Sequence, residues 1–333
     1  MAHLTVMHRT AYAYNRPVGL SPHRLMVRPQ DSHDLRLHAA TLTVEPPPAV
    51  TRWAHDVFGN SLCLLEWDPS VLTERLVITS ELELTHYPAG PELPAATLDP
   101  AAEHFPFSYA MEEVPDLARK AERQTPDPGR VVDGWARRFI QGAENTGTLA
   151  MLEAMTRAIQ AEFTYAARAE EGTQCPADTI ALGTGTCRDF ALLMMEAARC
   201  LGLAAKFVTG YLYDGASTGV VGGGATHAWC AIYLPGAGWL EFDPTNGLIA
   251  GDNLIRVGST RMPEQASPIS GGYIGKAEDF SGLSVDVTVT VLDGIAASMP
   301  AISEEMDDTA TGPSTSPDSP DATSACSASG VAA

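Results

Sequence analysis

The sequence predicts an α+β protein in two parts, a β-rich N-terminal region followed by a region that mixes helices and strands. Three observations support this prediction. Residues 3–87 alternate apolar and polar residues at strand period, residues 115–165 repeat apolar residues at helical period, and residues 226–243 return to alternation. A chain of 333 residues is also long enough for about two domains.

The N-terminal region predicts a small antiparallel β-sandwich. Two segments show the alternation most clearly, LRLHAATLTVE (Leu35 to Glu45) and RLVITSELELTHY (Arg75 to Tyr87). Between them, Gly59 and Asn60 separate two apolar runs, which is a hairpin signal. About half a dozen short strands separated by turns are typical of such a sandwich.

Composition gives the expected domain boundaries. The segment HYPAGPELPAATLDP is rich in proline and ends the β-rich N-terminal domain, which we place at residues 1–88. Residues 89–298 are expected to hold a helical segment and a second domain, with a core at about 145–250. Residues 299–333 are rich in Ser, Thr, Pro and Asp and contain no Lys or Arg, so we expect a disordered acidic tail.

The formal net charge of −20 argues against nucleic acid and against anionic membrane surfaces as partners. No apolar run approaches the ~18 residues of a membrane span, and no signal peptide is visible at the N-terminus. The six cysteines are irregularly spaced and form no CxxC pair, so no metal site is expected. We therefore expect a cytoplasmic protein with reduced thiols and no cofactor. The sequence gives no indication of the oligomeric state.

Cys187 lies where a turn of small residues passes into a helix. The stretch GTGTCRDFALLMMEAARCLGL (Gly183 to Leu203) begins with turn-forming residues, and its apolar residues then repeat at helical spacing up to Gly202. The first turn of a helix has unpaired N–H groups and the positive end of the helix dipole, which favour a thiolate. Since the thiolate is the nucleophilic form of cysteine, the position suits a nucleophile. The same N–H groups can bind an oxyanion.

The base predicted for Cys187 is His227, the only histidine after His104. The segment THAWCAIYL alternates like a strand, and the segment WLEFD after a PGAG turn predicts a second strand that ends at Asp243. Two strands joined by a tight turn can place His227 beside Asp243, whose carboxylate would orient the imidazole. The three residues form a nucleophile, base and orienter set.

Each member of this set also has an ordinary structural interpretation. A cysteine near a helix start is often a small buried apolar residue, and an aspartate before proline is often a turn former. A histidine on a strand is often a structural residue with satisfied hydrogen bonds. Their occurrence in one block, each at the end of its element, favours the chemical interpretation.

Several neighbouring residues are weaker candidates. Tyr165 and Gln174 precede the cysteine and could supply an oxyanion donor. Trp229 shares a strand face with the histidine and could line the substrate pocket or pack as a core aromatic. We expect Asp189 to accept hydrogen bonds from the first helical turn. Arg188 could pair with Asp189 or Glu196 or meet an acidic group of the substrate, and we favour a solvated side chain.

This block closely resembles the transglutaminase-like superfamily of cysteine enzymes, and in particular bacterial members with a separate β-rich N-terminal region. The matching motifs are the turn G-T-C-R-D-F, the Gly-Tyr strand end at Gly210, the H-A-W segment and the final D-P-T. They occur in this order within residues 163–247. The segment after D-P-T, VGSTRMPEQASP, departs from the pattern common among such relatives.

The resemblance implies a papain-like core, in which a helix bearing the cysteine packs on an antiparallel sheet, and a triad of Cys187, His227 and Asp243. It also implies acyl transfer from an amide through a thioester intermediate, so the expected partner is a peptide or protein substrate. We favour hydrolysis, as by a protease or amidase, over transfer to a primary amine as by a transglutaminase. A further alternative is a catalytically silent binding module.

Overall fold

The computed structural model of the chain describes residues 1–88, 95, 97–142, 146–166, 172–213, 226–249 and 253–292. Contacts divide the chain into two units, and all described elements belong to the first, Met1–Gly294. The predicted acidic tail, residues 299–333, lies outside the described residues.

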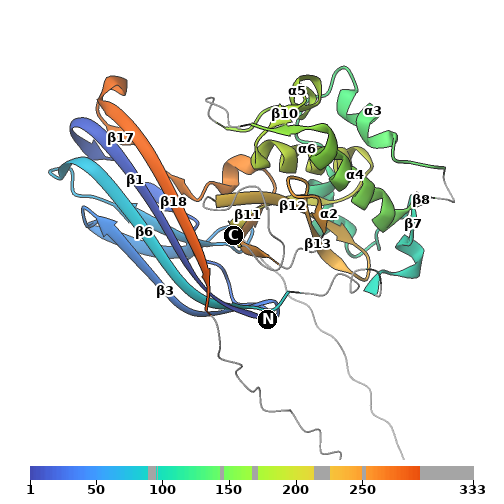
Figure 1. Cartoon of the computed structure of the whole chain (residues 1–333), viewed down its shortest axis with the longest axis horizontal. Coiled ribbons are helices and arrows are strands. Elements are labelled where there is room, and N and C mark those ends of the chain that lie inside the picture. Colours follow the sequence, from blue (N-terminus) through green and yellow to red (C-terminus); the bar gives the residue numbers. More distant parts are fainter. Residues whose placement is uncertain are drawn as a thin grey trace, which may run out of the picture. The chain divides into compact units, whose positions relative to one another are not determined.

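The N-terminal region forms two antiparallel sheets. The larger has the strand order β17-β1-β6-β3, with β18 also paired to β1 (Figure 1). Its strands are β1 (Ala2–Leu20), β3 (Leu35–Glu45), β6 (Leu72–His86), β17 (Tyr273–Ile274) and β18 (Phe280–Val291). The smaller has the order β16-β2-β5-β4, with strands β2 (His23–Leu25), β4 (Val50–His55), β5 (Ser61–Glu66) and β16 (Ile269–Ser270). Strands β1 and β6 run for 19 and 15 residues, longer than the short strands that the sequence predicts.

Both sheets contribute to one apolar cluster, which confirms the predicted β-sandwich. The cluster members are Tyr14, Val18, Leu20, Leu25, Val27, Cys63, Leu65, Trp67, Leu76 and Ile78. The predicted hairpin at Gly59 joins β4 to β5, and its glycine has a φ of 84°. The Asp56 carboxylate accepts the backbone N–H of Phe58 and of Asn60 at 2.9 Å, which fixes the turn.

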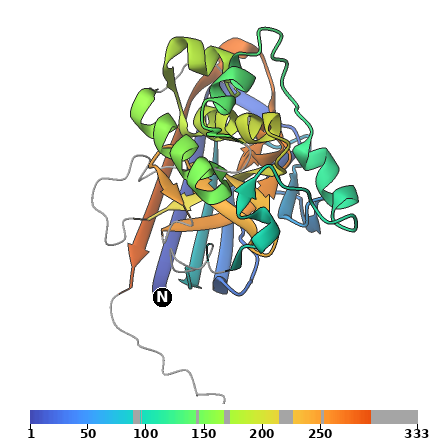
Figure 2. The same cartoon turned by 90° about the vertical axis from the view of Figure 1, so that its right-hand side faces the viewer.

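The chain returns to the N-terminal sandwich at its far end. Strand β18 pairs with β1 from Leu4 opposite Val291 onward, and Val287 is buried in the same cluster as Leu4. Figure 2 shows this red-orange strand beside the blue first strand. The prediction from sequence groups residues 89–298 with the second domain and does not include the pairing of β18 with β1. Alternation of apolar and polar residues predicts a strand but not the strand with which it pairs.

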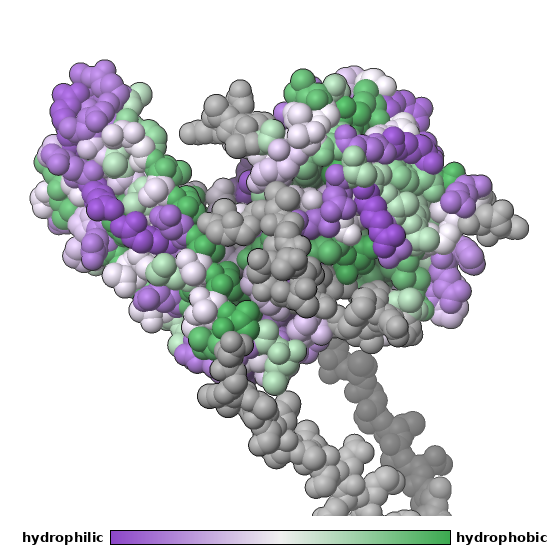
Figure 3. Space-filling model, viewed as in Figure 1, coloured by the Kyte–Doolittle hydropathy of each residue, from purple (hydrophilic) through white to green (hydrophobic). Residues whose placement is uncertain are grey.

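Strand β18 is largely exposed. Apolar side chains such as Leu283, 53% exposed, alternate along it with Ser284 and Asp286. In Figure 3 hydrophilic and hydrophobic residues are accordingly interspersed over the long strands. Such mixing is typical of an edge strand that faces water.

The second region contains an antiparallel sheet of order β14-β13-β12-β11-β15. Its strands are β11 (Ala205–Leu212), β12 (Thr226–Leu234), β13 (Gly238–Asp243), β14 (Leu248–Ile249) and β15 (Leu254–Thr260). The helices are α2 (Val114–Ala121), α3 (Val131–Arg137), α4 (Thr148–Glu162), α5 (Pro176–Leu182) and α6 (Cys187–Cys200). Short elements complete it: η1 (Pro100–Ala102), η2 (Pro263–Ala266), and the strand pairs β7 (His104–Phe105) with β8 (Thr146–Gly147) and β9 (Thr164–Tyr165) with β10 (Thr184–Gly185). The short helix η3 (Ala277–Asp279) lies between β17 and β18 and belongs to the sandwich. None of the helices that the structure describes has the length and apolar composition needed to cross a membrane.

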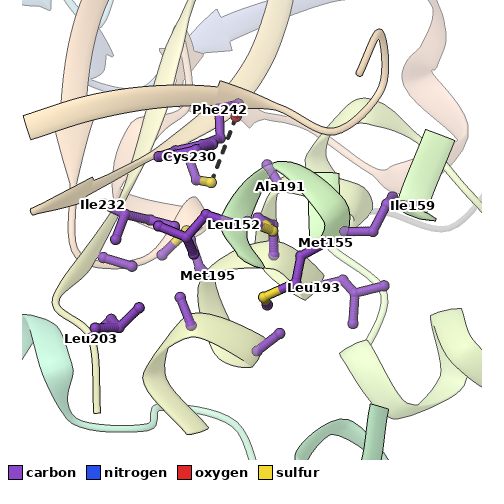
Figure 4. Close-up of a cluster of buried hydrophobic side chains, with 14 of the residues drawn as sticks. Leu152, Met155, Ile159, Ala191, Leu193, Met195, Leu203, Cys230, Ile232 and Phe242 are labelled. Atoms are coloured by element: carbon purple, nitrogen blue, oxygen red, sulfur yellow. Dashed lines mark hydrogen bonds between the residues drawn. The ribbon is translucent and has the colours of Figure 1, made fainter. Parts of the chain in front are cut away.

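Helix α6 packs on one face of this sheet and forms the centre of the main apolar core (Figure 4). On the sheet side the core takes Cys230 and Ile232 from β12, and the Cys230 thiol lies 3.6 Å from the carbonyl oxygen of Phe242. On the other side it takes the predicted stripe of α4, in which Leu152, Met155 and Ile159 are fully buried. Met155 is therefore a core residue. The α+β prediction, with a cysteine-bearing helix on an antiparallel sheet, is confirmed.

The sandwich and the second region share a further apolar cluster. It joins residues of β1 and β6 to residues of β11 and β15, including Leu4, Val6, Leu82, Leu84, Tyr211, Tyr213, Ile255 and Val257. Two buried histidine–tyrosine hydrogen bonds cross the same contact. His8 Nδ1 lies 3.0 Å from the Tyr211 hydroxyl, and His86 Nδ1 lies 3.1 Å from the Tyr213 hydroxyl. These contacts attach β11 and β15 to the sandwich.

Candidate active site

Cys187 is the first residue of helix α6, where the sequence places it. The preceding turn is held by Asp189, whose carboxylate accepts the backbone N–H and the hydroxyl of Thr186 at 2.8 and 2.9 Å. The same carboxylate accepts the backbone N–H of Gln174 at 2.7 Å, so the expected structural role of Asp189 is confirmed. Cys187 is 8% exposed, and its own backbone N–H donates to none of the described residues. A free N–H therefore points outward beside the thiol.

His227 lies in β12, opposite Gly210 of β11. Its Nε2 is 2.9 Å from Oδ2 of Asp243, and neither side chain is exposed. The other ring nitrogen, Nδ1, is buried and makes no full hydrogen bond within the described part of the chain. Cys187 nevertheless lies near enough to the imidazole to be among the groups that raise its pKa.

The environment of His227 favours the imidazolium. Burial lowers the pKa of His227, because the charged ring loses its hydration. The Asp243 carboxylate, by its charge and its hydrogen bond, and the Cys187 thiol outweigh that effect and raise the pKa to about 10. The imidazolium is therefore held between an anionic partner and a thiol that can become one.

Asp243 serves both of the functions that the sequence left open. Its Oδ1 accepts the backbone N–H of Thr245 at 3.0 Å and of Asn246 at 3.4 Å, so the carboxylate fixes the turn after β13. Its Oδ2 accepts the Asn246 side-chain amide at 2.8 Å in addition to the His227 contact. A carboxylate held by several donors cannot rotate freely, so it also fixes the orientation of the imidazole.

The Trp229 ring packs against the ring of His227. The two rings stack with centroids 5.9 Å apart and an interplanar angle of 28°. Trp229 is 0% exposed and packs as a core aromatic, and its role in lining a substrate pocket stays a prediction. A Cβ at Gly210 would lie 2.7 Å from the Trp229 ring and 2.0 Å from the carbonyl oxygen of Ile255. A side chain at position 210 would therefore clash with the Trp229 indole that stacks on His227, so this position of the Gly-Tyr motif requires glycine.

Tyr165 lies close to the thiol. It belongs to β9, which pairs with β10 in a parallel arrangement that places Tyr165 opposite Gly185. Burial, and then the charge of Cys187 and a hydrogen bond with it, raise the pKa of Tyr165 to about 12. The phenol therefore keeps its proton, and with 42% of the residue exposed it also faces solvent. The structure places this predicted residue near the thiol, and its role as an oxyanion donor stays a prediction.

Two other predictions near the cysteine are wrong. The side-chain amide of Gln174 donates to the hydroxyl of Thr179 at 3.0 Å and to the carbonyl of Thr184 at 2.9 Å, so both of its N–H groups are used inside the loop. It has none left for an oxyanion. Arg188 is partly buried rather than solvated: its guanidinium donates to the Pro263 carbonyl at 2.6 Å and lies 5.0 Å from the Phe207 ring centroid. Neither contact is local in sequence, which is why the pattern does not reveal it.

The other described cysteines have different environments. Cys63 and Cys230 are fully buried, whereas Cys175 and Cys200 are partly exposed, and all are free thiols. Burial raises the pKa of Cys200 to about 11. Within the described ranges, no three His, Cys, Asp or Glu side chains are grouped so as to hold a metal ion.

Comparison with known families agrees with this arrangement. Residues 133–244 match the family described as the transglutaminase-like superfamily, and residues 4–85 match the bacterial transglutaminase-like N-terminal region. This chain belongs to the transglutaminase-like superfamily. The superfamily match includes Cys187, His227 and Asp243, and the N-terminal match covers most of the β-sandwich of this transglutaminase-like protein.

Related proteins extend along most of the transglutaminase-like chain. The uncharacterised protein Rv2569c of Mycobacterium tuberculosis is 27% identical over 310 residues, which cover 87% of this chain and 93% of the relative. Protein ML0607 of Mycobacterium leprae is 32% identical over 106 residues, or 31% of this chain and 37% of its own. Among solved structures, a candidate cysteine protease from Cytophaga hutchinsonii has a TM-score of 0.62 at 17% identity, covering 89% of this chain and 93% of its own. The shared fold therefore includes both the sandwich and the core.

Proposed function

We propose that this protein is a cysteine enzyme that transfers acyl groups from amide or peptide substrates, with Cys187 as nucleophile, His227 as general base and acid, and Asp243 as the residue that orients His227. The observation that carries the proposal is the position of the His227 ring. One ring nitrogen is bound to Asp243 at 2.9 Å, and the ring also interacts with the Cys187 thiol. This arrangement suits nucleophilic catalysis, because a base lies between a thiol and the carboxylate that orients the base.

The proposed mechanism starts from the imidazolium form of His227, with the proton of Cys187 on Nδ1. In the first half of the reaction the thiolate sulfur of Cys187 attacks the substrate carbonyl carbon. The carbonyl π electrons move to oxygen and give a tetrahedral oxyanion. When the oxyanion collapses, the C–N bond breaks, and His227 gives its proton to the departing amine nitrogen. The acyl group remains on Cys187 as a thioester.

In the second half an acceptor attacks the thioester carbon. For hydrolysis the acceptor is water, which gives a proton to His227 as its oxygen bonds to the carbon. The C–S bond then breaks, the acid departs and the thiolate–imidazolium pair is restored. For amine transfer a primary amine replaces water, and the product is a new amide.

Two donors near Cys187 suit the oxyanion. Its own backbone N–H leads helix α6 and is not used by a described residue. The Tyr165 hydroxyl remains protonated, because its pKa is raised to about 12, chiefly by burial. A backbone N–H and a hydroxyl together form the kind of site that stabilises a tetrahedral oxyanion.

We favour hydrolysis over amine transfer. Water needs no acceptor site of its own, whereas a primary amine must be held next to a thioester on a residue that is only 8% exposed. The shared fold with a protein described as a candidate cysteine protease is in keeping with this choice.

A direct test incubates the protein with casein or a glutamine-containing peptide, together with a fluorescent primary amine, in water enriched in oxygen-18. Hydrolysis gives a product carboxyl group that contains the heavy oxygen, detected by mass spectrometry. We expect that product from wild type and from Cys200→Ala, and none from Cys187→Ala. Loss of activity in Cys187→Ala alone assigns the nucleophile.

Other outcomes favour the alternatives. If the fluorescent amine is incorporated at glutamine, amine transfer replaces hydrolysis as the function. If wild type and Cys187→Ala both leave every substrate of a peptide and isopeptide library unchanged, the protein is a silent binding module and the proposal is wrong.

A further inference from the structure

A cavity of about 600 Å³ lies away from the cysteine, at the contact between the sandwich and the core sheet. Its walls are residues 30–35 and 86–88 on one side, and strands β11, β13 and β15 on the other. None of Cys187, His227 and Asp243 lines it. Cavities of roughly 300–1,000 Å³ are typical of small-molecule sites, especially at domain contacts.

The cavity has an apolar body. Leu35 from the sandwich and Trp239, Leu240 and Leu254 from the core sheet are among its lining residues. A ligand that fills it would therefore bury apolar surface against both regions.

Apart from histidines, two cationic side chains line the cavity, Arg256 and Lys206. The charge of Arg256 is already neutralised by carboxylates. Arg256 donates to the Glu241 carboxylate at 2.6 Å and to the Asp34 carboxylate at 2.9 Å. Because Asp34 belongs to the sandwich side and Glu241 to β13, this ion pair also joins the two walls. Arg256 has no charge to offer a further anion.

The other cation, Lys206, is not neutralised. Its ammonium lies 4.3 Å from the centroid of the Trp239 ring, and it makes no hydrogen bond or ion pair with any residue in the described ranges. Burial, followed by the nearby charge of Arg256, lowers the pKa of Lys206 to about 8. The Glu241 carboxylate opposes this lowering without forming an ion pair with Lys206. The partly buried ammonium therefore contacts the Trp239 ring and has no direct anionic partner among the described residues.

We propose that this cavity binds a small monocarboxylate with an apolar body, whose carboxylate pairs with Lys206 and whose body packs on Trp239 and the neighbouring leucines. A single free ammonium matches a single negative charge. The carboxylates of Asp34 and Glu241 line the same cavity and would repel a dianion such as phosphate. The apolar walls select a ligand larger than acetate.

Isothermal titration calorimetry with 3-phenylpropionate tests the proposal, and hexanoate, phenylacetate and benzoate complete the set of probes. The neutral control is 3-phenylpropanol. None of these compounds contains an amide, so the proposed acyl-transfer site cannot consume them. We expect at least one acid to bind wild type with one site per chain, and 3-phenylpropanol to bind at least about tenfold more weakly than 3-phenylpropionate.

The matched variants are Lys206→Met, which keeps the length of the side chain and removes the charge, and Lys276→Met. Lys276 is exposed and pairs with Glu278 outside the cavity. We expect Lys206→Met to bind the acid at least about tenfold more weakly and Lys276→Met to bind as wild type does. Circular dichroism and the unfolding temperature check that each variant is folded.

Three outcomes would overturn the proposal: none of the four acids binds wild type, the acid and the alcohol bind equally, or folded Lys206→Met binds the acid as well as wild type. A Lys206→Met protein that fails to fold leaves the acid–alcohol comparison on wild type to decide.

Discussion

His227 shows how three contacts define one side chain. Asp243 fixes one ring nitrogen, Trp229 stacks on the ring face, and Cys187 interacts from the helix. Because all three contacts involve the same imidazole, the residues that fix the orientation of the ring also influence its charge. At this scale the structure goes beyond the sequence, which predicts the partners but not the stacking that holds the ring.

The pH dependence of stability should report the pKa of His227. That pKa rises from 6.5 to about 10 on folding, so the folded state binds this proton more tightly than the unfolded chain. The stabilising contribution is complete below pH 6.5 and is lost as the pH rises towards 10. Urea denaturation should show the free energy of unfolding of wild type falling relative to His227→Gln across this window. An equal difference at both ends of the window would contradict the assignment.

Tyr165→Phe tests the proposed oxyanion donor, because it removes the hydroxyl and keeps the ring that contacts Phe190. We expect the kcat for the substrate identified above to fall by about 10²–10³ and KM to change little. The free energy of unfolding should stay within about 1 kcal/mol of wild type. Tyr273→Phe is the control, since its hydroxyl bonds to Lys276 in the N-terminal region. Equal activities of the two variants would exclude the donor role.

At the scale of elements, the site is made where α6 and β12 begin and where β13 ends. The capping carboxylate of Asp189 fixes the start of α6, and the Asp243 carboxylate fixes the end of β13. Between them, Gly210 lets the indole of Trp229 lie flat over β11. The conformations of these element ends therefore determine the distance between thiol and imidazole.

Gly210→Ala should disturb this arrangement. The added Cβ would lie 2.0 Å from a backbone oxygen and 2.7 Å from Trp229, so either the strand or the indole must move. We expect a loss of about 3 kcal/mol in the free energy of unfolding, measured by denaturant titration. Gly282→Ala, where nothing lies within 4 Å of the new Cβ, is the control and should change little. Equal stability of the two variants would contradict the packing account.

The features that the sequence predicts correctly depend on residues close together in the chain. Helical period, strand alternation, the Gly59 turn and the capping residue Asp189 all depend on neighbours a few residues apart, and the structure confirms them. The contact of Arg188 with Pro263 and the return of β18 to β1 depend on the tertiary fold. No period in the chain encodes those partners.

At the scale of the whole molecule, the sandwich and the core form one continuous structure. Tyr211, adjacent to Gly210, bonds to His8 of the sandwich, and Arg256 of β15 binds Asp34. Strands β16, β17 and β18 complete the sandwich from the far end of the described chain. The N-terminal region is therefore a structural support for the strands that carry His227.

Truncation tests this dependence. A chain that ends at residue 292 keeps every contact described above and should unfold as the full chain does. A chain that ends at residue 279 lacks β18, so β1 loses a partner strand and the cluster around Leu4 loses Val287. We expect its unfolding temperature to fall by about 5 °C or more, measured by calorimetry. The same unfolding temperature for both chains would show that the returning strand is dispensable.

The most direct test of the central claim is the rate at which iodoacetamide alkylates each cysteine at mildly acidic pH, followed by mass spectrometry. If Cys187 is paired with His227, it should react at least about tenfold faster than the more exposed Cys200, because only a thiolate reacts. His227→Gln should remove that advantage. If Cys187 of wild type reacts no faster than Cys200, no activated thiolate is present and the proposed chemistry is wrong.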